Sequence, residues 1–197
     1  SQVFDEATLS TLRGDLGIGH NRYSTTGSTT WENAQPAFKT DGQRSLALGH
    51  NGNLVNTLEL AGRVGAAGAA TTDSDLVATI LARHPSEDLE SALVDVLPTL
   101  EGAFSFVVMD ERSIFAARDP HGLRPLSIGR LPNGFCVASE TCALDIVGAT
   151  FLRDVEPGEL VRIDDEVLHQ AGQPRGPARR GQVLGRALEP VGLGQDR

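Results

Sequence analysis

The sequence predicts an α+β fold, because strand-like and helix-like segments are grouped along the chain and do not alternate. Short apolar strands fall in the first 54 residues, two amphipathic helices follow between residues 72 and 97, and strands return from Ala103 onward. The 197 residues are 40% hydrophobic and 22% charged. This composition is ordinary for one globular domain with a sizeable core.

The first part of the chain shows alternating signals for strands and turns. Asp5 can cap a short helix that runs through Leu12. The apolar segment Leu16–His20 predicts a strand that enters a polar loop over Tyr23–Pro36. A second strand is predicted over Leu46–His50, ending at the turn signal Asn51-Gly52-Asn53.

The middle of the chain predicts helices. One is expected over Val55–Val64, followed by a Gly/Ala loop over Gly65–Ala70. Thr72 starts a second helix and Ser86 a third, each with acidic residues in its first turn. The apolar stripes of these two helices are Leu76, Val77, Ile80 and Leu81, and Leu89, Leu93, Val96 and Leu97.

The last third of the domain predicts strands. A hairpin is expected, with Ala103–Met109 and Ser113–Ala117 on either side of Asp110-Glu111-Arg112. A short helix is expected over Thr141–Val147. The remaining strands are predicted near Leu126–Ile128, Phe135–Ala138, Thr150–Arg153 and Glu159–Ile163.

The chain divides into a domain over residues 1–168 and a tail over residues 169–197. The tail holds six Gly, three Pro and five Arg against two acidic residues, and it lacks hydrophobic periodicity. This composition predicts a disordered or aberrant segment. A basic arm that binds a partner is the alternative.

Charge and cysteine content narrow the function classes. The net charge of −9 and the absence of a basic stripe argue against nucleic acid as a partner. No apolar run suits a membrane span and no signal peptide is visible, so we expect a cytoplasmic protein. Cys136 and Cys142 form neither a disulfide framework nor metal-ligand spacing, and we expect both to be small buried residues.

Three polar groups could together bind a free amino acid and act on an amide. Arg22 offers a planar guanidinium that can hold a carboxylate through two hydrogen bonds. Asp73 can hold an ammonium. Asn51-Gly52 offers an amide side chain beside an unhindered backbone N–H, a pair that suits a developing oxyanion.

Each of these residues also has an ordinary structural explanation. Arg22 can form a surface ion pair, Asn51-Gly52 can be a hairpin turn, and Asp73 can cap a helix. His20 and His50 are expected to form hydrogen bonds within the fold. The segment Arg118–Pro125 is expected to be a rigid loop without a catalytic role.

Taken together, the polar clusters resemble the class II glutamine amidotransferases, which are N-terminal-nucleophile hydrolases. More narrowly they resemble the amidophosphoribosyltransferase family, over about residues 1–166. The resemblance is specific because seven separated motifs occur in the same order: GIGHNRYSTTG, LALGHNGNLVN, TTDSDL, LEGAFSFVVMD, ARDPHGLRPL, ASETCALDIVGA and VEPGELVRI.

The resemblance implies a four-layer αββα sandwich and a mechanism. In the family an N-terminal cysteine attacks the glutamine amide, with its own α-amino group as the base. The resemblance places Asn51 and Gly52 in the oxyanion hole, Arg22 on the glutamine α-carboxylate with Tyr23 and Thr25 lining the pocket, and Asp73 on the α-ammonium. Ammonia then passes to a second domain and reacts with phosphoribosyl pyrophosphate, bound there with Mg²⁺.

The sequence also departs from the family. The segment Ser1–Phe4 resembles an internal position, a few dozen residues after the family's cysteine, and neither Cys136 nor Cys142 matches that nucleophile. Ser1 is not expected to replace it, because it should not face Asn51-Gly52. We therefore expect a fold without its first strands, a chain that is inactive alone, and no phosphoribosyltransferase domain. Mg²⁺, an iron–sulfur cluster and a homo-oligomer are expected only in the full-length family enzymes.

Two rival functions remain open from the sequence. Glucosamine-6-phosphate synthases share the pattern of Arg22, Asn51-Gly52 and Asp73, so an amidotransferase domain of that kind is one alternative. A non-catalytic glutamine-binding module is the other. Ammonia transfer to fructose-6-phosphate would favour the first, and glutamine binding without turnover the second.

Overall fold

The computed structural model describes residues 7, 10, 11, 14–21, 33–41, 44–63, 65, 72–164 and 167–171. Arg22, Tyr23 and Thr25 lie outside the described residues, as do most of the predicted first helix and all of the tail after residue 171. Within the described part, strands and helices are grouped as the sequence predicts, and the fold is α+β.

The larger sheet has six antiparallel strands in the order β1-β2-β3-β4-β8-β9. The long strand β2 and its partner β3 form its most extensive pairing, with eight residue pairs in register. The strand bounds are β1 Ala37–Asp41, β2 Arg44–Leu54, β3 Gly102–Met109, β4 Ile114–Arg118, β8 Leu160–Asp164 and β9 Val167–Gln170.

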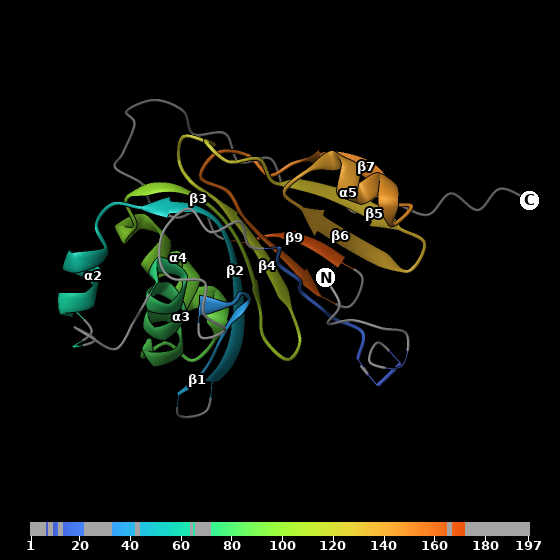
Figure 1. Cartoon of the computed structure of the whole chain (residues 1–197). Helices are drawn as coiled ribbons and strands as arrows, with labels where there is room; N and C mark the ends of the chain where they lie inside the picture. Colours follow the sequence, from blue (N-terminus) through green and yellow to red (C-terminus); the bar gives the residue numbers. More distant parts are fainter. Residues whose placement is uncertain are drawn as a thin grey trace, which may run out of the picture.

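Helices cover one face of this sheet (Figure 1). They are α3 (Asp73–Arg83), α4 (Leu89–Val96) and the 3₁₀ turn η2 (Leu97–Thr99), while the short helix α2 (Thr57–Arg63) lies beside α3, farther from the sheet. The predicted stripes of α3 and α4 pack into one core with β2 and β3, where Leu48, Phe106 and Val108 are fully buried. Alternate residues of a strand face opposite sides of the sheet, so the other face of β3 and β4 remains for a second layer.

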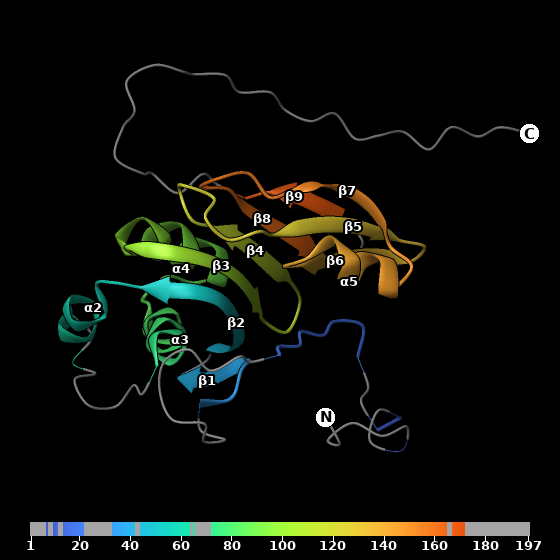
Figure 2. The same cartoon turned by 45° about the horizontal axis from the view of Figure 1, so that its top comes forward.

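The second layer is a smaller antiparallel sheet in the order β6-β5-β7 (Figure 2). Its strands are β5 (Ser127–Leu131), β6 (Gly134–Ala138) and β7 (Thr150–Asp154), and the short helix α5 (Thr141–Ile146) lies beside them. Ile128 and Val155 pack inward against Ala116, Val161 and Ile163 of the larger sheet.

The helix α5 covers the outer face of the smaller sheet. A Cβ added at Gly129 would lie 3.0 Å from the side chain of Leu144, while the neighbouring Ile128 points to the opposite, inner face. The layers therefore run helices, sheet, sheet, helix, and the αββα arrangement that the resemblance implied is confirmed.

Local details differ from the sequence expectations in four places. Leu16–His20 has no regular secondary structure, and β2 continues through Asn51–Asn53, where a turn was predicted. The cap of α4 is Asp88, whose side chain accepts from Ser91 N–H, and not Ser86. The predicted domain boundary at residue 168 falls inside β9, which extends to Gln170.

The Arg118–Pro125 segment is a rigid loop, as the sequence predicts. Asp119 is fully buried, and its carboxylate accepts the backbone N–H groups of Phe104, His121 and Leu123. The Arg118 guanidinium donates to the backbone carbonyls of Arg124, Val155 and Gly122 at 2.7–2.8 Å. These contacts tie β3 and β4 to the loop that follows β4 and to Val155, just after β7.

The expectation that both cysteines are buried is wrong. Cys142 is exposed on α5, and Cys136 is only partly buried on β6. Among the described residues, no helix is both long enough and apolar enough to cross a membrane.

Candidate active site

The site is built on an edge of β2 that β1 leaves open. The last pair between the two strands is Ala37 with Leu48, so β2 extends six residues further without β1. Just beyond that pair, the backbone N–H of His50 donates to Gln35 Oε1 at 2.7 Å, and the His50 carbonyl lies 3.1 Å from His20 Nε2. Side chains therefore replace a neighbouring strand at His50.

The backbone N–H of Gly52 points to the same open edge. N–H groups of alternate strand residues face the same side, and those of His50 and Leu54 are bound on this edge by Gln35 and Asp73. Phe104 lies opposite Gly52 on β3, but its N–H donates to the Asp119 carboxylate and its carbonyl accepts the Asp119 N–H. Phe104 therefore does not bind the backbone of Gly52. Gly52 thus presents an N–H donor between two occupied positions.

Position 52 needs glycine for both space and conformation. Its φ of 151° lies in a region that side chains other than glycine rarely adopt. A Cβ placed there would lie 2.0 Å from the carbonyl oxygen of Ala103. Asn51 and Gly52 therefore lie within β2, where Gly52 is in close contact with β3. The interpretation of these two residues as a hairpin turn is wrong.

Asp73 lies at the start of α3 and faces this edge of β2. Its Oδ2 accepts the N–H of Leu54 at 3.2 Å, and its Oδ1 accepts the N–H of Ser74 at 2.8 Å. His50 Nδ1 lies 3.5 Å from Oδ2. The side chain keeps 21% of its surface exposed, so the carboxylate is held in place but remains accessible.

The distance between Asp73 and Gly52 suits a glutamine side chain. The Asp73 carboxylate accepts the N–H of Leu54, which lies two residues beyond Gly52 on β2. A strand rises about 3.3 Å per residue, so the N–H groups of Gly52 and Leu54 are about 6–7 Å apart. The two methylene groups between the amide and the α-carbon of glutamine can bridge such a gap. The structural role of Asp73 is not the cap that the sequence offered as its ordinary explanation, since Thr72 is the N-cap of α3.

The environment of Asp73 favours its charged form. Burial raises the pKa of the Asp73 carboxyl, but the hydrogen bond and electrostatic attraction of the His50 ring and the N–H groups of Leu54 and Ser74 lower it, and the net shift is downward. The carboxylate is therefore ready to bind a cation at neutral pH.

This shift predicts a specific pH dependence of stability. A carboxyl whose pKa is lowered by folding adds stability above its unfolded pKa of about 4, and that stability is lost as the pH falls through the folded value. The difference in unfolding free energy between the wild type and Asp73→Asn should be largest near neutral pH and shrink below about pH 4. Urea denaturation across pH 3–7 measures it, and a difference that grows toward acid would contradict the assignment.

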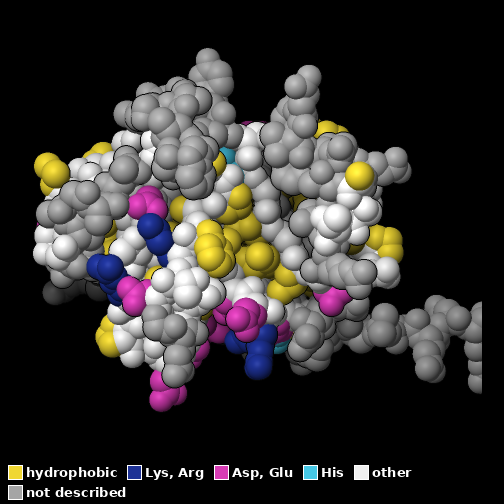
Figure 3. Space-filling view, turned by 60° about the horizontal axis from the view of Figure 1, so that its bottom comes forward, with side chains coloured by type: hydrophobic (Ala, Val, Ile, Leu, Met, Phe, Trp, Pro, Cys, Tyr) yellow, Lys and Arg dark blue, Asp and Glu magenta, His cyan; other side chains and the backbone are white. Residues whose placement is uncertain are grey.

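Asn51, Gly52 and Asp73 line one pocket of about 980 Å³. Its polar end also includes His20, Asn21 and Gln35, and its apolar wall lies between the two sheets, with Val107, Leu126 and Val137. Hydrophobic side chains gather in a central hollow on the face shown in Figure 3. Asn21 directly precedes Arg22, whose own placement lies outside the described residues.

The sequence interpretation missed several residues of this pocket. Gln35 fixes His50, and Arg124, Ser139 and Glu140 line the far side. Cys136 also lines it, and burial raises the pKa of its thiol. Only Gln35 and Arg124 lie in segments whose polar character could have drawn attention to them, and neither has a local pattern that specifies its contact.

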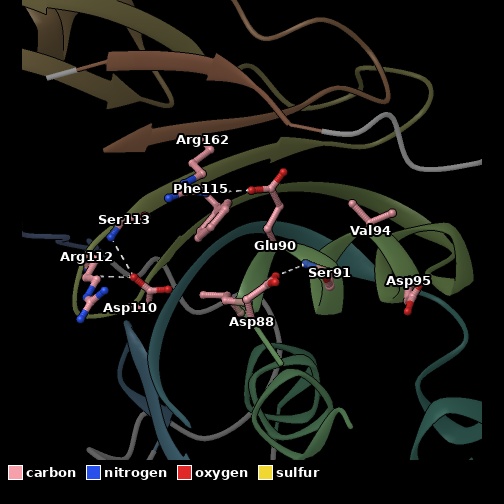
Figure 4. A pocket seen from close by; sticks show the side chains of 11 residues that line it. Asp88, Glu90, Ser91, Val94, Asp95, Asp110, Arg112, Ser113, Phe115 and Arg162 are labelled. Atoms are coloured by element: carbon pink, nitrogen blue, oxygen red, sulfur yellow. Dashed lines mark hydrogen bonds and ion pairs between the residues drawn. The ribbon is translucent and has the colours of Figure 1, made fainter. Parts of the chain in front are cut away.

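A second hollow of about 720 Å³ lies between the start of α4 and the β3–β4 hairpin (Figure 4). Its polar groups bind one another: Asp88 accepts from Ser91 N–H, Asp110 from the N–H groups of Arg112 and Ser113, and Arg162 pairs with Glu90 at 3.1 Å. None of the sequence-predicted site residues that the structure describes lines it. We therefore place the candidate active site in the larger pocket.

The described side chains include no group of three or more His, Cys, Asp or Glu residues arranged to hold a metal ion. Around Asp73, the side chains that line the larger pocket are mainly amides and imidazoles, from Asn21, Gln35, Asn51, Asn53, His20 and His50. This set suits hydrogen bonding to an amino acid better than metal coordination.

The fold and the pocket define a class of protein. Residues 20–145 match the glutamine amidotransferase domain family, and the chain belongs to that family. The matched segment contains Asn51, Gly52 and Asp73, which the structure brings together in the larger pocket.

Its relatives include amidophosphoribosyltransferases. The chain is 57% identical over 174 residues to the amidophosphoribosyltransferase of Mycobacterium tuberculosis, covering 83% of this chain and 33% of the relative. Identity to the Bacillus subtilis amidophosphoribosyltransferase is 44% over 170 residues, covering 84% and 36%. The chain therefore spans about a third of the length of these relatives.

A solved structure supports the same relationship. The glutamine phosphoribosylpyrophosphate amidotransferase of B. subtilis, complexed with ADP and GMP, aligns with a TM-score of 0.76 at 42% identity. The alignment covers 85% of this chain and 37% of that structure. These relatives do not favour the glucosamine-6-phosphate synthase alternative.

Proposed function

We propose that this chain is the glutamine-hydrolysing domain of an amidophosphoribosyltransferase. The observation that carries the proposal is the convergence of Asp73 and the Asn51-Gly52 pair on one pocket, which Asn21 also lines. A carboxylate at one end and an N–H donor about two strand residues away match the two ends of glutamine.

Each group has a role in this proposal. Asp73 binds the α-ammonium of glutamine, and Arg22 binds its α-carboxylate through two hydrogen bonds. Tyr23 and Thr25 line the pocket beside Arg22. The N–H of Gly52 and the side-chain amide of Asn51 stabilise the oxyanion that forms when the glutamine amide is attacked.

The attacking thiol is the N-terminal cysteine that the family resemblance implies. Cys136 lines the pocket, but burial raises the pKa of its thiol and so lowers its thiolate fraction at neutral pH. We expect the 197-residue chain to bind glutamine. Glutamate release should depend on a chain in which that cysteine stands at the N-terminus.

The whole protein is proposed to transfer the ammonia to phosphoribosyl pyrophosphate, forming 5-phosphoribosylamine for purine biosynthesis. This step belongs to the part of the relatives, about two thirds of their length, that the chain does not match. Mg²⁺, an iron–sulfur cluster and homo-oligomerisation are likewise expectations for the full-length enzyme. We expect a cytoplasmic protein without nucleic-acid or membrane partners.

Substitution of Arg22 tests the proposal directly. Arg22→Ala should weaken L-glutamine binding about tenfold or more, because a charge-assisted hydrogen-bonded pair with the α-carboxylate is lost. Arg112→Ala is the matched control, since this exposed arginine lies at the second hollow. Isothermal titration calorimetry measures both affinities. Unchanged affinity in Arg22→Ala would remove the assignment of Arg22 to the carboxylate.

A further inference from the structure

His50 lies beneath both ends of the proposed glutamine site. Its side chain is 1% exposed. Its Nδ1 lies 3.3 Å from Ser74 Oγ and 3.5 Å from Asp73 Oδ2. Its ring contacts Phe106 with centroids 4.7 Å apart, so core packing fixes the ring plane.

The other ring nitrogen faces the opposite end of the site. Nε2 is buried and has no hydrogen-bond partner among the described residues. A Cβ added at Gly52 would lie 2.8 Å from Nε2, so the ring edge sits directly behind the backbone of Gly52. The imidazole thus fills the space between the Gly52 backbone and the Asp73 carboxylate.

The neighbours of the ring indicate which nitrogen carries hydrogen. Both groups near Nδ1 can accept, because Asp73 is a carboxylate and Ser74 Oγ donates onward to Asp73 Oδ1 at 3.3 Å. A hydrogen on Nδ1 therefore has partners, whereas the described residues offer none for a hydrogen on Nε2. His50, Ser74 and Asp73 form a short polar network that orients the carboxylate.

We propose that His50 is a positioning residue of the glutamine site, whose Nδ1–H orients the Asp73 carboxylate while the ring edge supports the backbone of Gly52. Through these two contacts His50 sets the distance between the ammonium-binding group and the oxyanion donor. This inference rests on the proposed function. The competing explanation is a buried histidine that serves only to pack against Phe106.

Two substitutions separate positioning from packing. His50→Phe keeps a ring of similar shape against Phe106 and removes the donor to Asp73. His50→Asn loses the ring, but its side-chain amide can reach the position of Nδ1. A positioning role predicts that glutamine affinity falls about tenfold in His50→Phe, as expected for a lost hydrogen bond to a charged group, and is partly restored in His50→Asn. A packing role predicts the reverse order.

A double-mutant cycle with Asp73→Asn tests the route of the effect. If His50 acts through Asp73, His50→Phe should have almost no effect on glutamine affinity when residue 73 is already Asn. The expected change is less than about twofold, which is within the usual error of such cycles. Affinities are measured by NMR titration with L-glutamine, which reaches millimolar dissociation constants. His84→Phe is the matched control, because His84 also pairs with a serine hydroxyl but lies away from the pocket.

Each outcome decides a separate claim. A tenfold loss that disappears in the Asp73→Asn background, with recovery in His50→Asn, supports the inference. Equal losses in both backgrounds, or no recovery in His50→Asn, would overturn it and leave the proposed function standing. If the unsubstituted chain does not bind glutamine at all, the proposed function fails, and this inference fails with it.

Discussion

Gly52→Ala is expected to abolish glutamine binding and to destabilise the protein by about 3 kcal/mol or more, because the new methyl group overlaps backbone atoms. Its Cβ would lie 2.0 Å from the Ala103 carbonyl oxygen and 2.9 Å from the Ala103 carbonyl carbon. Neither atom can retreat without breaking the β2–β3 ladder. The φ of 151° adds conformational strain to this overlap.

A neighbouring glycine provides the matched control. Gly49 lies on the same strand, and a Cβ added there would meet the Val107 carbonyl oxygen only at 3.8 Å, an ordinary contact. Gly49→Ala should therefore change the free energy of unfolding by less than about 1 kcal/mol. Urea denaturation compares the two variants. Equal stability of Gly52→Ala and Gly49→Ala would show that the β2–β3 contact is not as close as described.

Asp119→Ala is expected to cause a loss of stability of about 3–5 kcal/mol, because it leaves several buried N–H groups without an acceptor. The Asp119 side chain is fully buried and accepts from His121 at 2.8 Å, Leu123 at 3.0 Å and Phe104 at 3.3 Å. The same substitution loosens the loop that carries Arg124 to the pocket. We therefore expect glutamine affinity to fall as well.

A partly exposed aspartate with similar contacts provides the comparison. Asp110 accepts the N–H groups of Arg112 and Ser113 at 2.8 Å, but it lies in the hairpin turn, where water can replace it. Asp110→Ala should cost only about 1 kcal/mol. Chemical denaturation of both variants tests the difference. If Asp119→Ala cost no more than Asp110→Ala, burial of the Asp119 carboxylate would not be the source of its effect.

The sequence predicts the layers of this fold because its periodicities are strong. The stripes of α3 and α4 and the β3–β4 hairpin each depend on local pattern and adjacent turn residues, and each is confirmed. The prediction of a turn at Asn51-Gly52 was wrong because turn propensity is local, whereas the pairing of β2 with β3 over eight residues keeps β2 extended. Leu16–His20 lacks a strand partner in the described structure, which no local pattern could reveal.

The candidate site was only partly predictable. Asn51, Gly52 and Asp73 could be selected because their chemistry suits an amide substrate, and they do share a pocket. Their roles stay predictions. The contacts of His50 with Ser74 and of Gln35 with His50 join residues 24 and 15 positions apart, and such pairs depend on topology. Sequence reasoning correctly expected His50 to bond within the fold, but it could not show that the ring lies between Asp73 and Gly52.

The most direct test of the account is an experimental structure of the chain with L-glutamine bound. The account predicts that the α-ammonium lies within hydrogen-bonding distance, about 3 Å, of the Asp73 carboxylate. It also predicts that the side-chain amide oxygen lies beside the N–H of Gly52, with the α-carboxylate at Arg22. Glutamine bound in the hollow beside α4, or bound in the larger pocket with its ammonium away from Asp73, would contradict the account.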